Sequence, residues 1–393
     1  MYMDPTLNPF NPGAGLRPPE MAGRDGEVAL FENLVVRARG HDPVGRGIVL
    51  SGLRGVGKTV LLRAMQNRAE HMGWTTVWFE GRTGAAGAAD TRTQLGRNLV
   101  SAGRRLVGRT PTARVREAVG SIGSFSASLG VSGVTLGITA REGRADTDNL
   151  ATNLTEMVED VLPVLAAEGT GLALFVDELQ DVDADLLLAL LAAQHEAGQR
   201  ELPFYVVGAG LPHLPGVLAA ARSYAERLFA YRRIGPLHHD DARDALVVPA
   251  ARYGATFTAP AVSGLVEASG GYPYFLQIYG KAVWDLAGST TFTAEDAAAA
   301  IALGRDELDD GFYPARLQRA TPAEREYLHQ MSIDGDGPSR TTTLAERMGR
   351  TASSLSPVRQ SLIDKGILYS PERGQIAYTV PGTADYLRRH PDA

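Results

Sequence analysis

Residues 51–59 constrain this chain more than any other stretch, because they read Ser-Gly-Leu-Arg-Gly-Val-Gly-Lys-Thr. The spacing Gly-x-x-x-x-Gly-Lys-Thr is typical of a loop that wraps around a phosphate group. Its glycines let the backbone turn without Cβ clashes, so the N–H groups point inward. An apolar run at residues 47–50 precedes the loop and a helix-like pattern follows it, which is the strand, loop and helix that the motif requires. The helix adds its positive N-terminal dipole, so we predict a phosphate-binding loop rather than a glycine-rich turn.

The side chains of this loop have distinct predicted roles in binding a nucleotide. We expect Lys58 to reach the β- and γ-phosphates and to take part in catalysis, and Thr59 to hold Mg²⁺ through its hydroxyl. The residues expected to bind ATP or ADP are Gly52, Gly55, Val56, Gly57, Lys58, Thr59 and Val60.

A second stretch carries two adjacent acids, since an apolar run at residues 171–176 ends in Asp177 and Glu178. At the carboxyl end of a buried parallel strand, a carboxylate meets the crevice in which ligands bind. We expect Asp177 to hold Mg²⁺ through water, and Glu178 to polarise the attacking water. Two acids at a strand end also occur as plain solvated groups, and the phosphate-binding loop upstream is what favours the catalytic interpretation.

The composition excludes several kinds of site and limits the partners of the chain. The 393 residues include no cysteine, which excludes disulfides, thiolate metal sites and a cysteine nucleophile and favours a cytoplasmic location. The longest apolar run, residues 186–193, is too short to cross a membrane, and residues 1–19 do not read as a secretory signal. The net charge of −6 gives no global positive field, so DNA binding requires a local patch.

The order of apolar runs and helical patterns predicts an α/β fold, and the length suggests two or three domains. Strands are expected near residues 47–50, 74–79, 171–176, 203–210 and 229–234. Because helical patterns separate them, we expect a parallel sheet with helices on both faces. The predicted domains are an extended N-terminal arm at 1–22, a nucleotide-binding core at 23–236, an alanine-rich helical lid at 237–315 and a C-terminal domain at 316–393.

Three segments of the first two domains each allow two interpretations. Residues 120–142 alternate apolar and small residues around Ser132-Gly133, which predicts an inserted β-hairpin. This hairpin either covers an exposed surface or contacts DNA or a neighbouring subunit. Arginines recur through residues 92–116, either on a solvated helix face or as a basic surface for DNA or a partner. Residues 17–24 either cover an adenine or form a plain linker.

The C-terminal domain reads as three helices followed by a β-hairpin, which is a winged helix-turn-helix. The side chains expected to face DNA are Ser354, Arg359 and Gln360 on the recognition helix and Arg373 on the wing. Residues 321–393 contain nine Arg or Lys and nine Asp or Glu, so the domain is near neutral. Because neutralised phosphates normally supply much of the affinity for DNA, binding to DNA and binding to a partner protein both stay open.

Taken together, the phosphate loop, the strand that ends in Asp-Glu, the Gly-Gly-Tyr-Pro-Tyr-Phe-Leu-Gln stretch at 270–277 and the winged helix resemble AAA+ ATPases. The closest resemblance is to the origin-recognition initiator branch and its prokaryotic relatives. It spans residues 20–390 and implies ATP binding with Mg²⁺ and hydrolysis. The residues that carry this role over are Lys58, Thr59, Asp177 and Glu178.

The chain departs from that family at two sensors of the bound nucleotide. Residues 208–210 lack a polar side chain, and Tyr272-Pro273-Tyr274 stands where many relatives have an arginine. These departures imply slow turnover. We expect Arg227, just before the fifth strand, to act as an arginine finger on a neighbouring subunit of a homo-oligomer. Its plain alternative is an ion pair with Glu226 or Asp240.

The resulting hypothesis is a cytoplasmic, slowly hydrolysing ATPase that uses ATP as a switch and binds DNA through its winged helix. The alternative is a signalling or scaffold ATPase, including a transposition- or defence-associated one, whose winged helix binds a partner protein. The arginine-rich segment and the polar recognition helix favour the first, and the near-neutral charge of the C-terminal domain favours the second.

Overall fold

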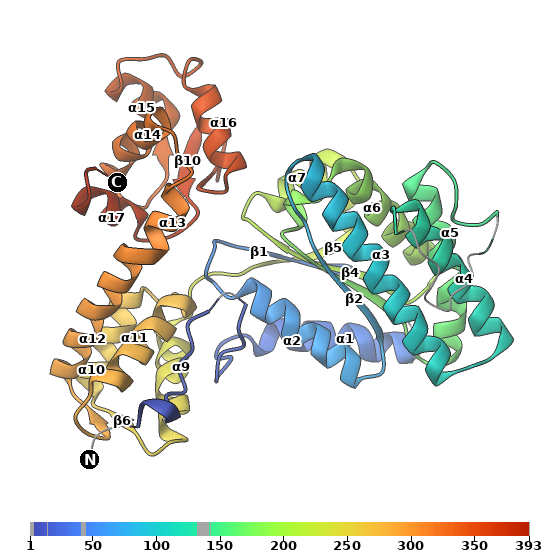
Figure 1. The fold of residues 1–393 in the computed structure, drawn as a ribbon, viewed down its shortest axis with the longest axis horizontal. Coiled ribbons are helices and arrows are strands. Elements are labelled where there is room, and N and C mark those ends of the chain that lie inside the picture. Colours follow the sequence, from blue (N-terminus) through green and yellow to red (C-terminus); the bar gives the residue numbers. More distant parts are fainter. Residues whose placement is uncertain (1–3, 14, 41–44, 132–140, 142, 393) are drawn as a thin grey trace.

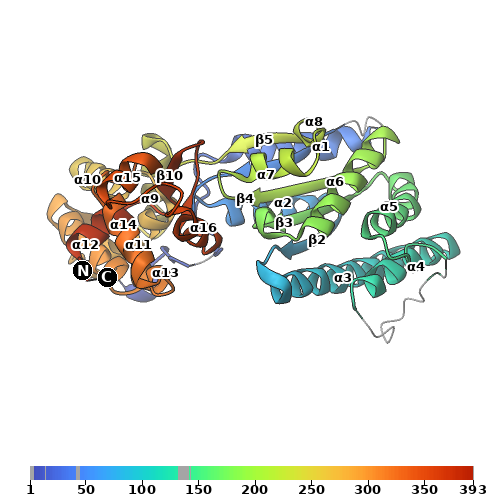
Figure 2. The ribbon, with the colours of Figure 1, turned by 90° about the horizontal axis from the view of Figure 1, so that it is seen from above.

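The computed structural model describes residues 4–13, 15–40, 45–131, 141 and 143–392. Figures 1 and 2 show a core built on a sheet, a group of helices beside it, and a C-terminal part beyond those helices. None of the helices within these ranges combines the length and the apolar character needed to cross a membrane.

A five-stranded parallel sheet forms the centre of the core. Its strands are β1 (Gly47–Ser51), β2 (Thr75–Glu80), β3 (Leu172–Asp177), β4 (Phe204–Gly210) and β5 (Phe229–Arg233). They are arranged in the order β2-β3-β4-β1-β5. The predicted α/β class and parallel sheet are therefore confirmed. The strands could be recognised because parallel strands buried on both faces read as continuous apolar runs.

Helices cover both faces of the sheet (Figure 2). On one face, Phe31 of α1 and Leu62 of α2 share a hydrophobic cluster with Phe175 of β3. On the other face, Leu99 of α3 and Leu186 of α6 share a second cluster that also contains neighbouring strand residues. The helices of the core are α1 (Asp25–Arg39), α2 (Lys58–His71), α3 (Gly84–Arg109), α4 (Ala113–Ser128), α5 (Leu150–Ala167), α6 (Ala184–Gln199), α7 (Leu214–Ala221) and α8 (Ala225–Leu228).

The prediction of a β-hairpin at 120–142 is wrong for its first half, because helix α4 extends to Ser128. Thr112 caps this helix by accepting a hydrogen bond from Val115 N at 3.2 Å. The buried positions recur with helical spacing and include Val115, Val119, Ile122 and Phe125, so helical packing overrode a local alternation of small and apolar residues. Residues 132–140 and 142 of the predicted hairpin lie outside the described residues.

The segment predicted as a lid is helical. Its main helices are α9 (His239–Ala251), α10 (Ala259–Ser269), α11 (Pro273–Leu286) and α12 (Ala294–Glu307). Two short strands, β6 (Thr256–Phe257) and β7 (Thr291–Phe292), pair in parallel at one end of these helices. A π-helical turn (Leu308–Phe312) and helix α13 (Tyr313–Leu317) then lead to the C-terminal part.

The C-terminal part contains the three helices and the hairpin that the sequence predicts, with one further strand and one further helix. Its elements are α14 (Pro322–Ser332), β8 (Ser339–Arg340), α15 (Thr341–Arg347), α16 (Ser356–Asp364), β9 (Leu368–Tyr369), β10 (Gln375–Tyr378) and α17 (Thr383–Arg389). The strands form an antiparallel sheet in the order β8-β10-β9. Thr321 and Glu324 form the expected capping box at the start of α14.

The described part of the N-terminal arm runs along the lid as an extended segment with one 3₁₀ turn (Pro5–Leu7). Phe10 is buried against α11, where Gly280 leaves room for its ring. Asn8 Nδ2 donates to Lys281 O at 3.2 Å and to Asp285 Oδ1 at 2.8 Å. These contacts attach the arm to the lid before it continues toward the core.

Candidate functional site

The loop between β1 and α2 has the backbone that its glycines predict. Gly55 and Gly57 adopt φ values of +84° and +90°, a left-handed region that favours glycine. Gly52 N donates to Gly210 O at 3.1 Å, which ties the start of the loop to the end of β4. Helix α2 begins at Lys58, directly after the loop. Backbone N–H groups and a helix N-terminus therefore converge at one place, as binding of an anion requires.

Lys58 is buried at this place, with 7% of its surface exposed. Its Nζ donates to Leu53 O at 2.9 Å, within its own loop. Burial lowers the pKa of Lys58, and the charges of Glu178 and Asp177 act in the opposite direction. The ammonium group thus donates to a neutral carbonyl. A phosphate oxygen could take the place of this carbonyl, and the charge-assisted hydrogen bond that it accepts would be stronger.

The end of β3 meets the start of α2 through a hydrogen bond between two predicted metal-binding residues. Thr59 Oγ1 donates to Asp177 Oδ2 at 2.7 Å. Asp177 is 6% exposed, and burial raises its pKa while the Thr59 hydrogen bond lowers it. A hydroxyl and a carboxylate oxygen at this separation fit adjacent ligand positions of one hard cation. Elements 118 residues apart in sequence therefore meet as predicted.

Glu178 follows Asp177 in a left-handed backbone conformation, with φ +45°. Its Oε1 lies 3.4 Å from Arg54 Nη1, and its Oε2 accepts a hydrogen bond from Gln180 Nε2 at 2.8 Å. Gln180 Oε1 in turn accepts from Leu211 N at 3.0 Å, just after β4. A non-glycine residue in this conformation carries local strain, which is common at functional sites.

Gln180 brings a polar side chain to the end of β4, where the sequence predicts none. The end of β4 has no polar side chain of its own, yet the amide of Gln180 connects Glu178 to Leu211 at that end. Gln180 is visible in the sequence two residues after Glu178. Its reach to β4 depends on the parallel pairing of β3 with β4, which no local pattern reveals.

Asp181 lies near Glu178 and Gln180, and its raised pKa predicts how the stability of the fold depends on pH. Burial raises the pKa of Asp181 from 3.8 to about 6, and the charge of Glu178 adds to this effect. Between about pH 4 and 6 the unfolded chain releases this proton while the folded chain keeps it, so the free energy of unfolding falls as the pH rises. We expect Asp181→Asn to be more stable than wild type by about 1 kcal/mol near pH 7, since partial exposure screens the effect.

The measurement is urea denaturation of both proteins across this range of pH. The stability difference between them is expected to shrink toward zero as the pH falls to about 4. A difference that does not change with pH would contradict the raised pKa of Asp181 and would indicate a packing effect of the substitution instead.

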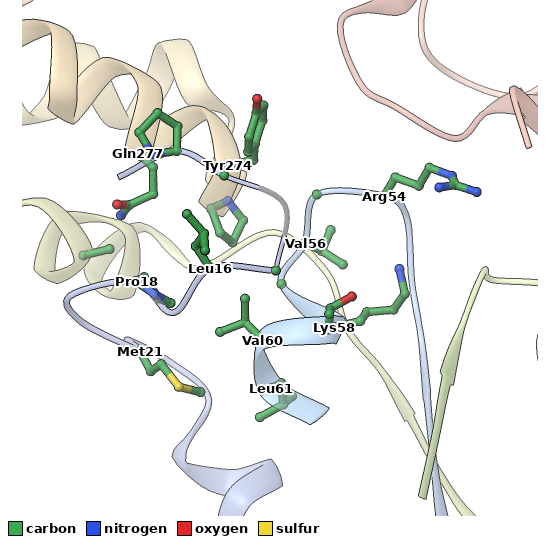
Figure 3. Close-up of a pocket in the computed structure, with 18 of the residues that line it drawn as sticks. Leu16, Pro18, Met21, Arg54, Val56, Lys58, Val60, Leu61, Tyr274 and Gln277 are labelled. Carbon is green, nitrogen blue, oxygen red and sulfur yellow. The ribbon is translucent and has the colours of Figure 1, made fainter. Parts of the chain in front are cut away.

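A cleft of about 430 Å³ extends from the phosphate loop to the lid and the N-terminal arm. Figure 3 shows Leu16, Pro18 and Met21 of the arm opposite the loop, with Tyr274 and Gln277 of the lid on another side. Asn11 N donates to Gln277 Oε1 at 3.3 Å, which joins the arm to α11 at the cleft. Five of residues 17–24 line the cleft, namely Pro18, Glu20, Met21, Ala22 and Arg24. Their contact with an adenine stays a prediction.

Arg24 anchors the arm to the core beside this cleft. Its Nη2 donates to Val56 O at 3.2 Å and to Gly235 O at 2.6 Å. Burial lowers the pKa of Arg24. One side chain thus connects the start of α1, the phosphate loop and the connection that follows β5.

Arg316 is a cation of the cleft that the sequence analysis missed. It comes from α13, and its guanidinium lies 4.4 Å from the centre of the Phe312 ring. Burial lowers the pKa of Arg316, with further lowering by the positive charge of Arg54. The family pattern places an arginine at the position of Tyr272-Pro273-Tyr274. In this structure an arginine reaches the cleft from α13, the helix that follows the lid.

Arg54 connects the phosphate loop to the C-terminal part. Its backbone N donates to Thr379 O at 3.1 Å, just after β10. Gly366 approaches its side chain so closely that a Cβ at this position would lie 2.8 Å from Arg54 Nη2. Arg54 also pairs with Glu178, so one residue touches both the acid at the end of β3 and the C-terminal part.

The remaining predicted site residues lie away from the cleft. Arg227 is exposed on α8, and in the described residues it forms no ion pair with Glu226 or Asp240. Ser354 and Arg373 are also exposed in the C-terminal part. The predicted contacts of these three side chains are with other molecules, and they stay predictions.

The two other predicted DNA contacts lie on α16 and already have partners. Arg359 is half-buried, and its Nη2 donates to Ser356 Oγ at 3.2 Å. Gln360 is exposed and donates to Asp364 Oδ1 at 2.8 Å. The acid beside Gln360 means that this helix face presents a negative charge as well as polar groups.

Comparison with known families identifies two regions of the chain. Residues 20–207 match the family described as AAA ATPase domain. Residues 310–387 match a family described as a domain of unknown function, DUF8462. None of the curated proteins matches the chain.

Several solved structures are similar to the chain over most of its length. RuvB of Thermotoga maritima, a Holliday junction branch migration motor, has 16% identity and a TM-score of 0.45, covering 95% of this chain and 99% of that chain. Orc1 of Aeropyrum pernix, solved in complex with DNA, has 17% identity and a TM-score of 0.45, covering 95% and 94%. Cdc6p of Pyrobaculum aerophilum has 14% identity and a TM-score of 0.48, covering 98% and 96%.

Proposed function

We propose that this chain, which carries an AAA ATPase domain at residues 20–207, binds ATP with Mg²⁺ in the cleft described above and hydrolyses it slowly. The observation that carries this proposal is the 2.7 Å contact between Thr59 Oγ1 and Asp177 Oδ2 beside the buried Lys58. It brings a metal-binding pair and a phosphate-binding cation together at the N-terminus of one helix, as nucleotide hydrolysis requires.

The proposed roles follow from the positions of the polar atoms. Thr59 would hold Mg²⁺ through its hydroxyl and Asp177 would hold it through water, and the metal would neutralise phosphate charge when bound. Lys58 exchanges the Leu53 carbonyl for phosphate oxygens, and Glu178 orients the attacking water. Both carboxylate oxygens of Glu178 already have partners, and each keeps a second lone pair that can accept a hydrogen bond from the water. The end of β4, which has no polar side chain of its own, supports slow turnover.

The base and the phosphates have separate proposed contacts. The arm, through Leu16, Pro18 and Met21, covers the base on the side of the cleft that faces the lid. Arg316 contributes positive charge toward the phosphates, the part assigned to a sensor arginine in the family. Arg227 is exposed on α8 and is proposed to act on ATP bound to a neighbouring subunit of a homo-oligomer.

We further propose that ATP sets the position of the C-terminal part through Arg54. Its Nη1 lies 3.4 Å from Glu178 Oε1, and its side chain also lies against Gly366 of the C-terminal part. A bound γ-phosphate offers the guanidinium a new anionic partner, so these two side-chain contacts change when ATP binds. Such differential contacts in two states are what a ligand-driven switch requires.

The output of this switch is proposed to be DNA binding by the winged helix, through Ser354, Arg359, Gln360 and Arg373. Further support comes from Arg340 and Arg350, which are exposed and have no ion pair among the described residues. Arg340 lies on β8, which pairs with β10 next to the wing. These arginines offer the local positive charge that a near-neutral domain needs for phosphate contacts.

The second candidate function is a scaffold or signalling ATPase in which this domain binds a partner protein. The contact of Gln360 with Asp364 favours this second function. The amide that would read a base is already hydrogen-bonded, and Asp364 places a negative charge on the same helix. In that case ATP still changes the position of the domain, and duplex DNA is not its ligand.

The DNA hypothesis is tested by replacing Arg359 and Arg373 with alanine. We expect weaker binding to duplex DNA and a slope of log affinity against log salt that falls by about 1 for each lost phosphate contact, with unchanged affinity for ATP. The measurement is fluorescence anisotropy at several salt concentrations, with and without ATP. The control is Arg243→Ala, which removes an exposed charge from α9 far from the wing.

If wild type shows no salt-sensitive binding to DNA in either nucleotide state, the DNA hypothesis fails and the scaffold function takes its place. If the double variant and Arg243→Ala weaken binding equally, the contact is not made by the winged helix. Either result leaves the proposed ATPase activity to be judged on its own measurements.

A further inference from the structure

A second large hollow lies away from the nucleotide cleft, along the outer edge of β2. This trough has a volume of about 760 Å³ and is lined by residues of α2, β2 and α3. β2 is an end strand of the core sheet, with α2 and α3 beside it (Figures 1 and 2). No residue of the phosphate loop lines the trough, so it needs an explanation of its own.

Protection of the exposed strand edge explains only part of this lining. Asn98 Nδ2 donates to Trp78 O at 2.7 Å, and Gln94 Oε1 accepts from Glu80 N at 3.0 Å. Thr91 Oγ1 donates to Glu80 O at 3.0 Å. These side chains satisfy outward-facing backbone groups and prevent another strand from pairing with β2. Edge protection therefore accounts for Asn98 and Gln94 of the lining and leaves its arginines unexplained.

The positively charged residues of the lining are three arginines, which converge on the trough from two helices. Arg63 of α2 lies 3.4 Å from the centre of the Trp78 ring. Arg105 and Arg109 lie one turn apart on α3. Arg105 donates to Ser101 Oγ at 3.0 Å and to Thr76 O at 3.5 Å. Arg109 donates to Gly73 O at 3.3 Å and to Thr75 Oγ1 at 3.4 Å, so all the partners of both are neutral groups. Within the described residues, none of the three forms an ion pair.

The trough has a surplus of positive charge and of hydrogen-bond donors. Glu70 is the one acid in its lining, and Glu70 Oε1 already accepts from Gln66 Nε2 at 3.1 Å. With three arginines against this single acid, the lining carries a net positive charge.

We propose that this trough binds a small ligand with two or more phosphate groups. The forked guanidinium groups match phosphate oxygens in geometry and charge. Side chains one helical turn apart can meet adjacent phosphates, and Arg63 faces them from the opposite wall. A small ligand is favoured over a nucleic acid strand because the arginines are grouped within one hollow. The site is independent of ATP hydrolysis and of the proposed winged-helix function.

The test uses tripolyphosphate as the probe and the full chain as the protein. The Lys58→Ala variant removes the strongest phosphate contact in the nucleotide cleft, so calorimetry on this variant reports the trough. We expect it to bind one tripolyphosphate. Adding Arg105→Gln and Arg109→Gln should weaken that binding on the order of tenfold or more, because two charge-assisted contacts are lost.

The matched control adds Arg97→Gln and Arg116→Gln to Lys58→Ala instead. Both arginines are exposed, and neither lines the trough, so the net charge changes equally. Melting curves of all variants verify folding. The proposal is supported if only the trough pair weakens binding, and Arg63→Gln should then weaken it as well.

Three outcomes would overturn the proposal. Lys58→Ala could bind no tripolyphosphate, or the control pair could weaken binding as much as the trough pair, which would indicate a general effect of charge. The trough pair could also reduce binding of a short single-stranded oligonucleotide while leaving tripolyphosphate binding unchanged, which would assign the surface to nucleic acid.

Discussion

Replacing Lys58 with alanine is expected to abolish measurable ATP binding, with a loss of affinity on the order of 100-fold or more. Lys58 Nζ is buried at the start of α2, and its present partner is the neutral carbonyl of Leu53 at 2.9 Å. No other lysine lines the cleft. Because burial already lowers the pKa of this amine, removing it should cost the fold little. Titration with a fluorescent ATP analogue measures the effect.

Lys281→Ala is the matched control for this variant. Lys281 is an exposed lysine on α11 that pairs with Asp285 at 3.0 Å, and its loss should leave ATP affinity unchanged. If Lys58→Ala bound ATP within about threefold of wild type, a difference of less than 1 kcal/mol, the assignment of the phosphate loop would be contradicted. A loss of ATP binding in both variants would point to damage to the lid or the fold.

Replacing Glu178 with glutamine is expected to leave ATP binding intact and to lower the rate of hydrolysis by about 100-fold to 10,000-fold, the usual contribution of a general base. The amide keeps the size of the side chain and can still meet Gln180, which lies 2.8 Å from Glu178 Oε2. It cannot take a proton from the attacking water. Single-turnover release of phosphate, measured beside ATP affinity, separates the two effects.

The control is Glu295→Gln, an exposed acid in the first turn of α12. Its hydrolysis rate should equal that of wild type. A Glu178→Gln protein with wild-type turnover would move the role of base to another group. A protein that loses ATP affinity in parallel with turnover would show that Glu178 acts through the loop, by way of its contact with Arg54.

The fold was predictable where the local sequence shows which residues are buried. The strands of the sheet are apolar runs in the sequence because helices cover both of their faces. The phosphate loop can be recognised because its φ values of +84° and +90° favour glycine at those positions. The capping box at Thr321 is equally local. The segment at 120–128 was misread, because small residues alternating with apolar ones suit both a strand and the helix α4 that forms there.

Some residues of the candidate site could likewise be identified from local motifs, and others only from the structure. Lys58, Thr59, Asp177 and Glu178 could be identified from sequence because each lies within a short motif, and the structure brings all four together. Gln180 could not be assigned, since its partner Leu211 lies 31 residues away, just after the neighbouring strand β4. The same applies to Arg316, which comes to the cleft from α13, a helix that has no nucleotide motif.

By itself, the sequence determined the backbone conformation of the phosphate loop and the two acids at the strand end, because these depend on adjacent residues, and it predicted their chemistry. Only the tertiary structure decided what that chemistry is connected to. The contacts of Arg54 with Glu178 and with Thr379 join segments that lie far apart in the chain. So does the passage of the N-terminal arm across the cleft. Such contacts are set by how helices and strands pack, and packing leaves no local pattern at the residues that meet.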